Sequence, residues 1–395
     1  MAGDVLAAKP PRHFFLDWLR IGAFALLVLY HVGMYYVRWD WHVKAPELLP
    51  ELEPWMRLSN PWRMSLLFLL SGAATVWMLQ GGRTGLLRER SRRLLLPLAL
   101  GVVLIVPPQS YFEVVQKFRF EGGYADFLRL YFSAHAGFCR DGRCLVLPTW
   151  NHLWFLPYLW CYTVLLVLLH RTFPRRWTVT MASRFGHLPA WQLWLGPLLW
   201  LALLRLTLGV RFPSTYALVD DFFNHATYFS CFLLGAGLAA NMHLFARIET
   251  LRWWAAAASL LCWAGISVSV SVSVDAAPGL AVSPQDLRSL QGAAHAALQW
   301  SAIVAALGFG YRHLNRDHRW RAPLTEAVFP VYLVHQTWII LLAMALRPWG
   351  LAPGWEAALL ASGTLLLSLG TWQLARHSGV LRPWWGLPGL SVKSR

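Results

Sequence analysis

The sequence has little charge for its length. Only 14% of its 395 residues are Asp, Glu, Lys or Arg, whereas 57% are hydrophobic and 24 are tryptophans. In soluble globular domains about a quarter of the residues are charged. The scarcity of charge therefore excludes a soluble globular protein, and the mean hydropathy of +0.43 indicates an integral membrane protein.

Uninterrupted apolar runs make up most of the chain. A helix of about 20 residues crosses a hydrocarbon core roughly 30 Å thick. The first run is too long for a cleavable signal peptide and is expected to remain as the first span. The alternating stretch ISVSVSVSV is predicted to end a helix, because an isolated strand cannot cross lipid. The sequence predicts an all-α, polytopic membrane bundle of about ten transmembrane helices, over residues 14–37, 60–79, 94–111, 148–170, 188–208, 224–241, 253–274, 291–310, 323–346 and 357–375.

Acidic residues are scarcer than basic ones, 19 against 35, which gives a net charge of +16. The segments predicted on the side of the termini hold 21 Lys and Arg, and the connections predicted on the opposite side hold 11. An excess of Lys and Arg in short loops marks the cytoplasmic side, so both termini are predicted to be cytoplasmic. This topology accounts for the positive net charge, and no nucleic-acid partner is expected.

The sequence shows no internal repeat of fixed period and no soluble domain at either end. It predicts one integral-membrane domain over 1–395, with a core at about 12–377 and short cytoplasmic tails at 1–11 and 378–395. Two long outer loops, 38–59 and 112–147, are aromatic and mixed in charge rather than rich in Gly and Ser. They are expected to fold over the bundle, where they could receive a substrate.

Cysteine is rare, with five in the chain. Two of them, Cys139 and Cys144, lie in the outer loop 112–147, where a disulfide could persist. Their spacing alone leaves open whether they are bridged. The spacing of Cys and His fits no familiar metal template, so no metal site is expected. The other three fall within predicted spans and are expected to be packing residues: Cys161, Cys231 and Cys262.

Ionisable residues are costly in hydrocarbon, yet the first predicted span contains Asp17, Arg20 and His31. Eleven residues correspond to about three helical turns, so Arg20 and His31 project from nearly the same face, roughly 16 Å apart along the axis. Asp17 precedes Arg20 by three residues and can pair with it. Two interpretations remain open. Either this face is functional, or Arg20 reaches the interface while His31 packs against another polar group.

A cluster of arginines precedes the third predicted span. Arg90 and Arg93 lie one helical turn apart if that helix begins early, and paired guanidiniums suit phosphate or pyrophosphate. The same residues are also expected from the cytoplasmic excess of positive charge alone. Both explanations remain open for the whole cluster of Arg83, Arg88, Arg90, Arg92 and Arg93.

The fourth and ninth predicted spans carry further polar residues. Asn151, His152 and Trp154 lie at the outer interface, where Trp is expected on physical grounds and a polar helix start is common. Glu326 and His335 lie nine residues apart in the ninth span, about 2.5 turns, and therefore face opposite ways unless Pro330 kinks the helix. A simple Glu–His dyad within this helix is not expected.

Several stretches together resemble the acyltransferase 3 family of integral-membrane acyltransferases, in particular its glucan biosynthesis protein C members. Arg20 and His31 fit the family signature of an Arg and a His separated by ten residues in the first span. Arg90 and Arg93 fit its cytoplasmic Arg-x-x-Arg pattern, and Ser71 lies in a segment similar to its Ser-Gly motif. The matching stretches are FLDWLRIGAFALLVLYHVGMYYVRWDWHVK, NPWRMSLLFLLSGAAT, RERSRRLLLPL, NHLWFLPYLW and FPVYLVHQ.

The resemblance implies a ten-helix enzyme of the bacterial inner membrane with no bound cofactor. A cytoplasmic acyl-CoA would be the co-substrate. Its acyl group, of the acetyl or succinyl class, would pass to a hydroxyl of an envelope carbohydrate such as a periplasmic glucan. Expected partners are membrane lipid and other proteins of envelope-glycan biosynthesis.

The residues then take expected roles. The catalytic group would be His31, Arg20 and Asp17, with His31 as general base. The donor would be bound by Arg90, Arg93, Arg88 and Ser71. The acceptor or its pocket would involve Asp40, Trp41, Asn151, His152, Trp154, Glu326, Tyr332 and His335. The alternative is a transporter or flippase for an envelope glycan or lipid precursor, although Asp17 and Glu326 are a thin supply of intramembrane acids for proton coupling.

Overall fold

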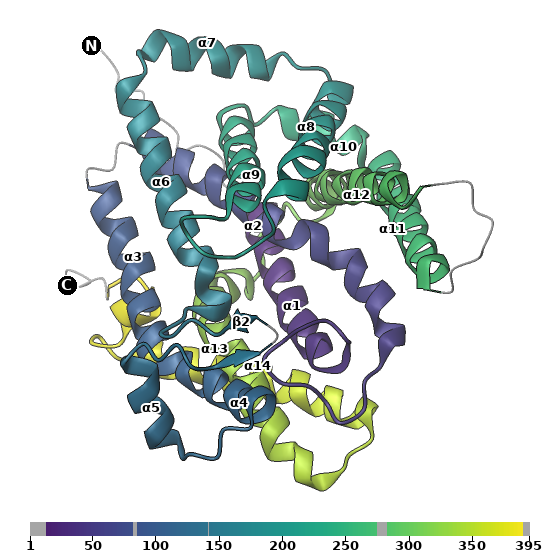
Figure 1. The fold of residues 1–395 in the computed structure, drawn as a ribbon. Helices are drawn as coiled ribbons and strands as arrows, with labels where there is room; N and C mark the ends of the chain where they lie inside the picture. The colour runs from purple at the N-terminus through teal and green to yellow at the C-terminus, as the bar shows by residue number, and fades with distance from the viewer. Residues whose placement is uncertain (1–12, 82–84, 141, 275–282, 390–395) are drawn as a thin grey trace.

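The structure is a computed structural model that describes residues 13–81, 85–140, 142–274 and 283–389. Helices make up most of it, and the predicted all-α polytopic fold is confirmed (Figure 1). Among the described residues, eight helices are long and apolar enough to cross a membrane, or up to ten if each of two bent pairs counts as one span. The ten predicted spans agree with the larger of these two numbers.

The long helices are α1 (Phe14–Tyr36), α2 (Glu53–Gln80), α6 (Phe155–Thr172), α8 (Ala190–Arg211), α9 (Phe222–Ala240), α11 (Arg252–Val274), α12 (Pro284–His313), α13 (Arg321–Leu346) and α14 (Pro353–His377). The shorter α-helices are α3 (Leu86–Leu100), α4 (Pro107–Phe118), α5 (Tyr124–Phe132), α7 (Arg175–Gly186) and α10 (Leu244–Thr250). Short 3₁₀ turns are η1 (Pro50–Leu52), η3 (Asn151–Trp154), η4 (Arg347–Trp349) and η5 (Arg382–Trp385), and η2 (Gly101–Ile105) is a π-helical turn. The stretch 266–274 lies in α11 and is helical, as predicted.

The third predicted span is a broken helix, and the helix of the sixth is followed by a sharp turn into α10. The third consists of α3, which continues through η2 and bends by 41° into α4. The break falls at Pro107 and Pro108, which lack the amide hydrogen needed to continue the preceding helix. In the second pair, α10 turns by 112° from α9. Because α3 begins at Leu86, the arginines from Arg88 to Arg93 lie on a helix and not in a loop.

Two glycines allow α2 and α9 to cross closely. A Cβ atom added to Gly72 on α2 would overlap the backbone carbonyl of Phe232 on α9. A Cβ added to Gly235 on α9 would overlap the carbonyl of Leu69 on α2. Only glycine fits on both sides of this contact. The Ser-Gly motif of the second span therefore contains a packing residue, Gly72, next to Ser71.

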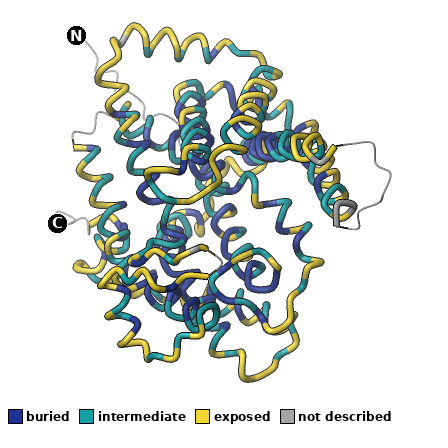
Figure 2. Tube along the Cα trace, in the orientation of Figure 1, coloured by how far each residue is buried: buried dark blue, intermediate teal, exposed yellow. Residues whose placement is uncertain are grey.

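The helices differ in how far they are buried. Of the residues in the most apolar stretch of α13, 72% are buried, whereas only 17% are buried in the corresponding stretches of α8 and α11. Figure 2 shows the same contrast between the centre and the periphery of the bundle. The central position of α13, with α1 packed against it, brings polar residues of both helices together.

The outer loops fold onto the bundle, as predicted. In the loop after α1, Val43 is fully buried. The Lys44 ammonium donates hydrogen bonds to the carbonyls of Met34 and Val37, each at 2.7 Å, and so caps the last turn of α1. In the second loop, Phe127 and Tyr131 of α5 are fully buried. Both loops therefore have fixed places over the outer end of the helices.

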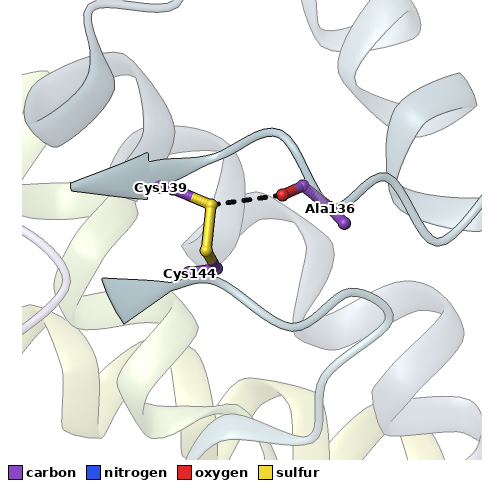
Figure 3. Close-up of a disulfide and its surroundings, with 3 residues drawn as sticks. All are labelled: Ala136, Cys139 and Cys144. Carbon is purple, nitrogen blue, oxygen red and sulfur yellow. Dashed lines mark hydrogen bonds between the residues drawn. A yellow bond between two sulfur atoms is a disulfide. The ribbon is translucent and has the colours of Figure 1, made fainter. Parts of the chain in front are cut away.

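A short hairpin of β1 (Cys139–Arg140) and β2 (Arg143–Cys144) completes the second loop. The Cys139 and Cys144 sulfurs form a disulfide that closes it, with Cα atoms 4.0 Å apart (Figure 3). The Cys139 sulfur also lies 3.3 Å from the Ala136 carbonyl oxygen. This arrangement fits a loop exposed to an oxidising compartment.

The segment after α14 is more than a tail. Residues 378–389 include η5, which packs against α3 and α14, and Leu387 is only 6% exposed. The predicted tail 378–395 therefore belongs to the bundle as far as residue 389. The predicted N-terminal tail 1–11 and residues 390–395 lie outside the described ranges.

The topology predicts where reporter fusions are active. In Figure 1, α7 lies at one end of the bundle and α5 at the other. A fusion after residue 180, in α7, is expected to report the cytoplasm, because its connection is rich in arginine. A fusion after residue 130, in α5, is expected to report the outside. Paired alkaline phosphatase and fluorescent-protein fusions make the measurement, and a cytoplasmic signal at 130 contradicts the orientation.

Candidate functional site

Two cavities lie along α1, one near each end. The outer cavity has a volume of about 450 Å³ and contains His31, and the inner cavity has a volume of about 550 Å³ and contains Arg20. The predicted common face of Arg20 and His31 is therefore a cavity-lining face. Other residues of the outer cavity include Trp41, Arg63, Asn151, His152, Trp154 and Tyr332. Other residues of the inner cavity include Phe24, Ser71, Arg90, Arg93, Phe155 and Thr325.

His31 is paired with a second histidine, His335 on α13. The His31 Nδ1 and His335 Nε2 atoms are 2.8 Å apart, and the ring centroids are 5.0 Å apart. His335 is fully buried, and its Nδ1 lies 2.8 Å from the backbone carbonyl of Tyr332. Trp41 from the outer loop lies nearly parallel to the His31 ring, with centroids 6.5 Å apart.

These contacts fix the tautomers of a neutral pair. A carbonyl oxygen only accepts, so the His335 Nδ1 must carry a hydrogen and donate it to Tyr332. The His335 Nε2 is then the acceptor, and His31 must donate its Nδ1 hydrogen to it. The His31 Nε2 is left with a lone pair. His31 is thus held in the tautomer whose basic nitrogen is free for a ligand of the cavity.

A network of buried amides supports the outer cavity behind His152. The Gln109 side chain donates to Thr337 Oγ1 at 2.7 Å and accepts from Asn151 and Gln336 at 3.1 and 3.0 Å. His152 contacts the Leu333 carbonyl through Nε2 at 3.1 Å, and Gln109 through Nδ1 at 3.4 Å. Both nitrogens of His152 are therefore engaged, which leaves His31 as the better placed base.

Charged residues of the outer loops stand at the mouth of the outer cavity. Lys117 Nζ lies 2.7 Å from Asp40 Oδ1 and 2.9 Å from Glu113 Oε1. His42 Nδ1 pairs with the other oxygen of Glu113. All four line the cavity, and Asp40 is largely exposed. The mouth is therefore polar and carries both signs of charge, which suits a ligand with many hydroxyls.

An arginine on α2, Arg63, also lines the outer cavity and is only 2% exposed. Its guanidinium carbon lies 3.7 Å from the centroid of the Tyr30 ring. Its Nη1 lies 3.4 Å from Ser59 Oγ. Arg63 was not among the functional residues predicted from the sequence, although an arginine inside an apolar span was the available signal.

Aromatic side chains separate the two cavities. Phe24 and Phe155 line the inner cavity, whereas Tyr332 lines the outer one. The Tyr332 ring centroid lies 5.5 Å from that of Phe24 and 6.0 Å from that of Phe155, both in edge-on contact. The Tyr332 hydroxyl donates to the His152 carbonyl at 2.7 Å. These three rings, Phe24, Phe155 and Tyr332, form a layer in which the wall of the inner cavity meets the wall of the outer one.

The inner cavity is cationic. Arg20, Arg90 and Arg93 line it, and no acidic residue does so among the residues of the described chain that form its wall. The Arg90 Nη2 lies 3.1 Å from Thr75 Oγ1, while its Nε is buried without a hydrogen-bond partner. The Ser71 hydroxyl donates to the Leu67 carbonyl at 2.7 Å. Three guanidiniums around one cavity are suited to an anion with several oxygens.

Arg88 occupies a neighbouring cavity. That cavity has a volume of about 630 Å³ and is formed by the start of α3 and the C-terminal segment, with Arg88, Glu89, Arg92 and Arg93 in its wall. Arg93 lines both this cavity and the inner one, so the two adjoin. Arg88 does not line the inner cavity with Arg90 and Ser71, the residues with which it was grouped for donor binding. Arg83 of the same cluster lies outside the described residues.

Asp17 forms an ion pair with a residue of another helix, which the sequence did not predict. Its Oδ2 lies 2.7 Å from Nη1 of Arg321 on α13, and Arg321 also pairs with Asp317 at 2.7 Å. The sequence suggested Arg20 because only residues of the same helix can be compared by spacing. The ion pair with Arg321 links α1 to the start of α13, at the end of both helices that is predicted to be cytoplasmic.

Glu326 lies away from both cavities. It pairs with Arg382 at 3.4 Å and with Arg376 at 3.7 Å, next to the C-terminal segment. His335, on the opposite face of α13, contacts His31. The expectation that these two do not form a dyad is confirmed, since Pro330 leaves α13 continuous. The helix face that carries Glu326 points towards α14 and η5, so Glu326 does not line the outer cavity.

The sequence profile of one family covers nearly the whole chain. The profile, described as an acyltransferase domain, matches residues 13–373. No curated protein and no solved structure matches the chain significantly. The matched range includes both cavities and the three-ring layer between them.

Proposed function

The chain belongs to the acyltransferase 3 family of integral-membrane acyltransferases, and from this premise we propose that it is an O-acyltransferase acting across the membrane. The proposed donor is a cytoplasmic acyl-CoA with an acyl group of the acetyl or succinyl class. The proposed acceptor is a hydroxyl of an extracytoplasmic carbohydrate, such as a periplasmic glucan. The bacterial inner membrane is the proposed location, with other envelope-glycan proteins as partners.

The observation that carries the proposal is the pair of unlike cavities on one face of α1. A cationic cavity with three arginines lies at the predicted cytoplasmic end, and a cavity with an oriented histidine lies at the outer end. Coenzyme A carries a pyrophosphate and a 3′-phosphate, which require cations. A carbohydrate hydroxyl requires a base to become an effective nucleophile. The two cavities match these two requirements on the two sides of the membrane.

The reaction needs the thioester to pass the three-ring layer and reach His31. The acceptor oxygen then attacks the thioester carbonyl carbon while the His31 Nε2 takes the hydroxyl proton. A C–O bond forms and the carbonyl electron pair moves onto oxygen. Collapse of this intermediate restores the carbonyl, breaks the C–S bond and returns the proton to the leaving thiolate. The products are an ester and free coenzyme A.

The donor site divides between the two adjoining cavities. We propose that Arg90 and Arg93 hold the pyrophosphate, with Arg20 and Ser71 along the arm that leads to the thioester. Arg88 and Arg92, in the cavity that shares Arg93, would meet the 3′-phosphate end. This division explains why one arginine cluster serves two cavities.

Removing these arginines is expected to weaken donor use. Arg90→Ala and Arg93→Ala should each raise the KM for acyl-CoA, and each Lys variant should recover only part, because lysine lacks the planar fork of donors. Initial rates at varied acyl-CoA measure the effect. Arg184→Ala, in exposed α7 on the same predicted side, is the matched control. An unchanged donor KM in both variants would assign the cluster to topology alone.

A transporter or flippase is the second candidate, because two cavities divided by a ring layer also suit alternating access. The purified protein should be reconstituted in vesicles with acetyl-CoA or succinyl-CoA and a glucan. Acceptor-dependent release of thiol, with acyl ester found on the glucan, supports the acyltransferase. Movement of glycan without thiol release supports the transporter.

A further inference from the structure

Arg63 is a buried cation without a carboxylate partner. Its guanidinium lies over the Tyr30 ring, its Nη1 lies 3.4 Å from Ser59 Oγ, and its Nε has no hydrogen-bond partner among the described residues. Arg321, which is similarly buried, pairs with two aspartates. A buried charge is costly unless it is paired. The fold therefore retains Arg63 in a state that an anion in the outer cavity would stabilise.

The other Lys or Arg side chain in the wall of the outer cavity is already committed. Lys117 is held between Asp40 and Glu113. Arg20, by contrast, lies in the inner cavity beyond the three-ring layer. Within the described part of the chain, Arg63 is thus the cation of the outer cavity that has no competing carboxylate.

The position of Arg63 relative to His31 is set by Tyr30. The Tyr30 ring contacts the guanidinium on one side, and its centroid lies 5.8 Å from that of the adjacent His31 ring. Arg63 and His31 come from different helices, α2 and α1, and both line the same cavity. A carbonyl group held in that cavity can therefore meet the base from one side and the cation from another.

The proposed reaction creates a negative charge in this cavity. When the acceptor oxygen attacks, the carbonyl π electrons become a lone pair on the carbonyl oxygen, and His31 receives the proton. Hydrogen-bond donors that are already positioned for such an oxyanion bind the intermediate better than the substrate. They therefore lower the barrier, whereas donors that bind both equally do not. Resting on the proposed function, we infer that Arg63 donates hydrogen bonds to this oxyanion and is a catalytic residue of the transfer.

The test compares Arg63→Gln and Arg63→Lys with wild type, using acetyl-CoA and succinyl-CoA as donors and a glucan acceptor. Arg63→Gln should lower kcat by about 10²–10³ with both donors, because every acyl group forms the same oxyanion. Arg63→Lys keeps the charge but loses the forked arrangement of donors, so its kcat should lie between those of wild type and Arg63→Gln. The dissociation constant for coenzyme A should not change, which also shows that the variants are folded.

The matched control is Arg205→Gln on α8. Arg205 is likewise an intramembrane arginine, and its guanidinium lies 5.8 Å from the Phe223 ring, but it lines a separate cavity with Arg288 and His295. Its kcat should stay close to that of wild type.

Three results would overturn the inference. A wild-type kcat in either Arg63 variant removes the oxyanion role. A loss confined to succinyl-CoA shows that Arg63 binds the second carboxylate of that acyl group instead. A weakened affinity for coenzyme A that accounts for the whole loss shows a structural role. By contrast, wild-type protein that transfers neither acyl group contradicts the proposed function itself, and the two failures are therefore distinguishable.

Discussion

Replacing His31 by glutamine is expected to lower kcat for acyl transfer by about 10²–10⁴, the usual contribution of a positioned general base. Glutamine approximates the length of histidine but its amide is not basic at any working pH. The substitution therefore removes proton transfer and keeps most of the cavity volume. Thiol release from acyl-CoA in the presence of a glucan measures the rate.

The His31→Gln substitution should lower the rate of acyl transfer without weakening donor binding. The His31 ring lies in the outer cavity, beyond the three-ring layer from the arginines of the inner cavity, so the affinity for coenzyme A should remain that of wild type. His295→Gln is the matched control, because His295 is also a half-buried histidine of a long helix but lines the separate cavity with Arg205. Full transfer by His31→Gln would make His31 a packing residue.

Helical periodicity was enough to place Arg20 and His31. Both side chains lie on one face of α1 because eleven residues are close to three whole turns, and no tertiary information enters that argument. The same reasoning separated Glu326 from His335. In each case the residues belong to one continuous helix, so spacing alone fixes their relative direction.

Contacts between helices could not be predicted in this way. His31 and His335 are 304 residues apart, and so are Asp17 and Arg321. The sequence around one member of each pair does not predict the other member. Which helix faces which depends on close crossings such as that of Gly72 with Phe232, where backbone shape decides the packing. The ion pairs of Glu326 with α14 and η5, and the place of Arg88 beside the C-terminal segment, could not be predicted for the same reason.

Arg63 shows a different limit. Its depth within an apolar helix was visible in the sequence, but the same depth suits an arginine that reaches the interface. Within the described residues Arg63 forms no ion pair with a carboxylate, and it lies in the cavity wall, and both of these are tertiary facts. Sequence periodicity thus finds which faces are polar, whereas the structure finds which polar groups lack a partner.

The second large effect is expected at His335, which acts through His31. His335 Nε2 accepts the His31 Nδ1 hydrogen and so keeps the His31 Nε2 free to take a proton. His335→Leu removes that acceptor, and His31 can then place its hydrogen on Nε2 and lose its basic atom on the cavity side. In a serine-protease triad, a change that favours the wrong histidine tautomer lowers kcat by about 10⁴. We expect a smaller loss here, about 10²–10³, because a neutral imidazole orients its partner less strongly than a carboxylate does.

The conservative variant separates this positioning role from a packing role. In His335→Gln, the side-chain amide oxygen can take the place of Nε2 and accept from His31, whereas His335→Leu keeps the volume but has no acceptor. If His335 sets the tautomer, kcat should be much higher in His335→Gln than in His335→Leu, with the donor KM and the affinity for coenzyme A equal in both. Nitrogen NMR of labelled histidine in the two variants should show His31 protonated on Nδ1 in the first and on Nε2 in the second. Equal rates in the two variants, with the His31 Nδ1 hydrogen retained in both, would show that Trp41 and the cavity wall orient His31 without help from α13.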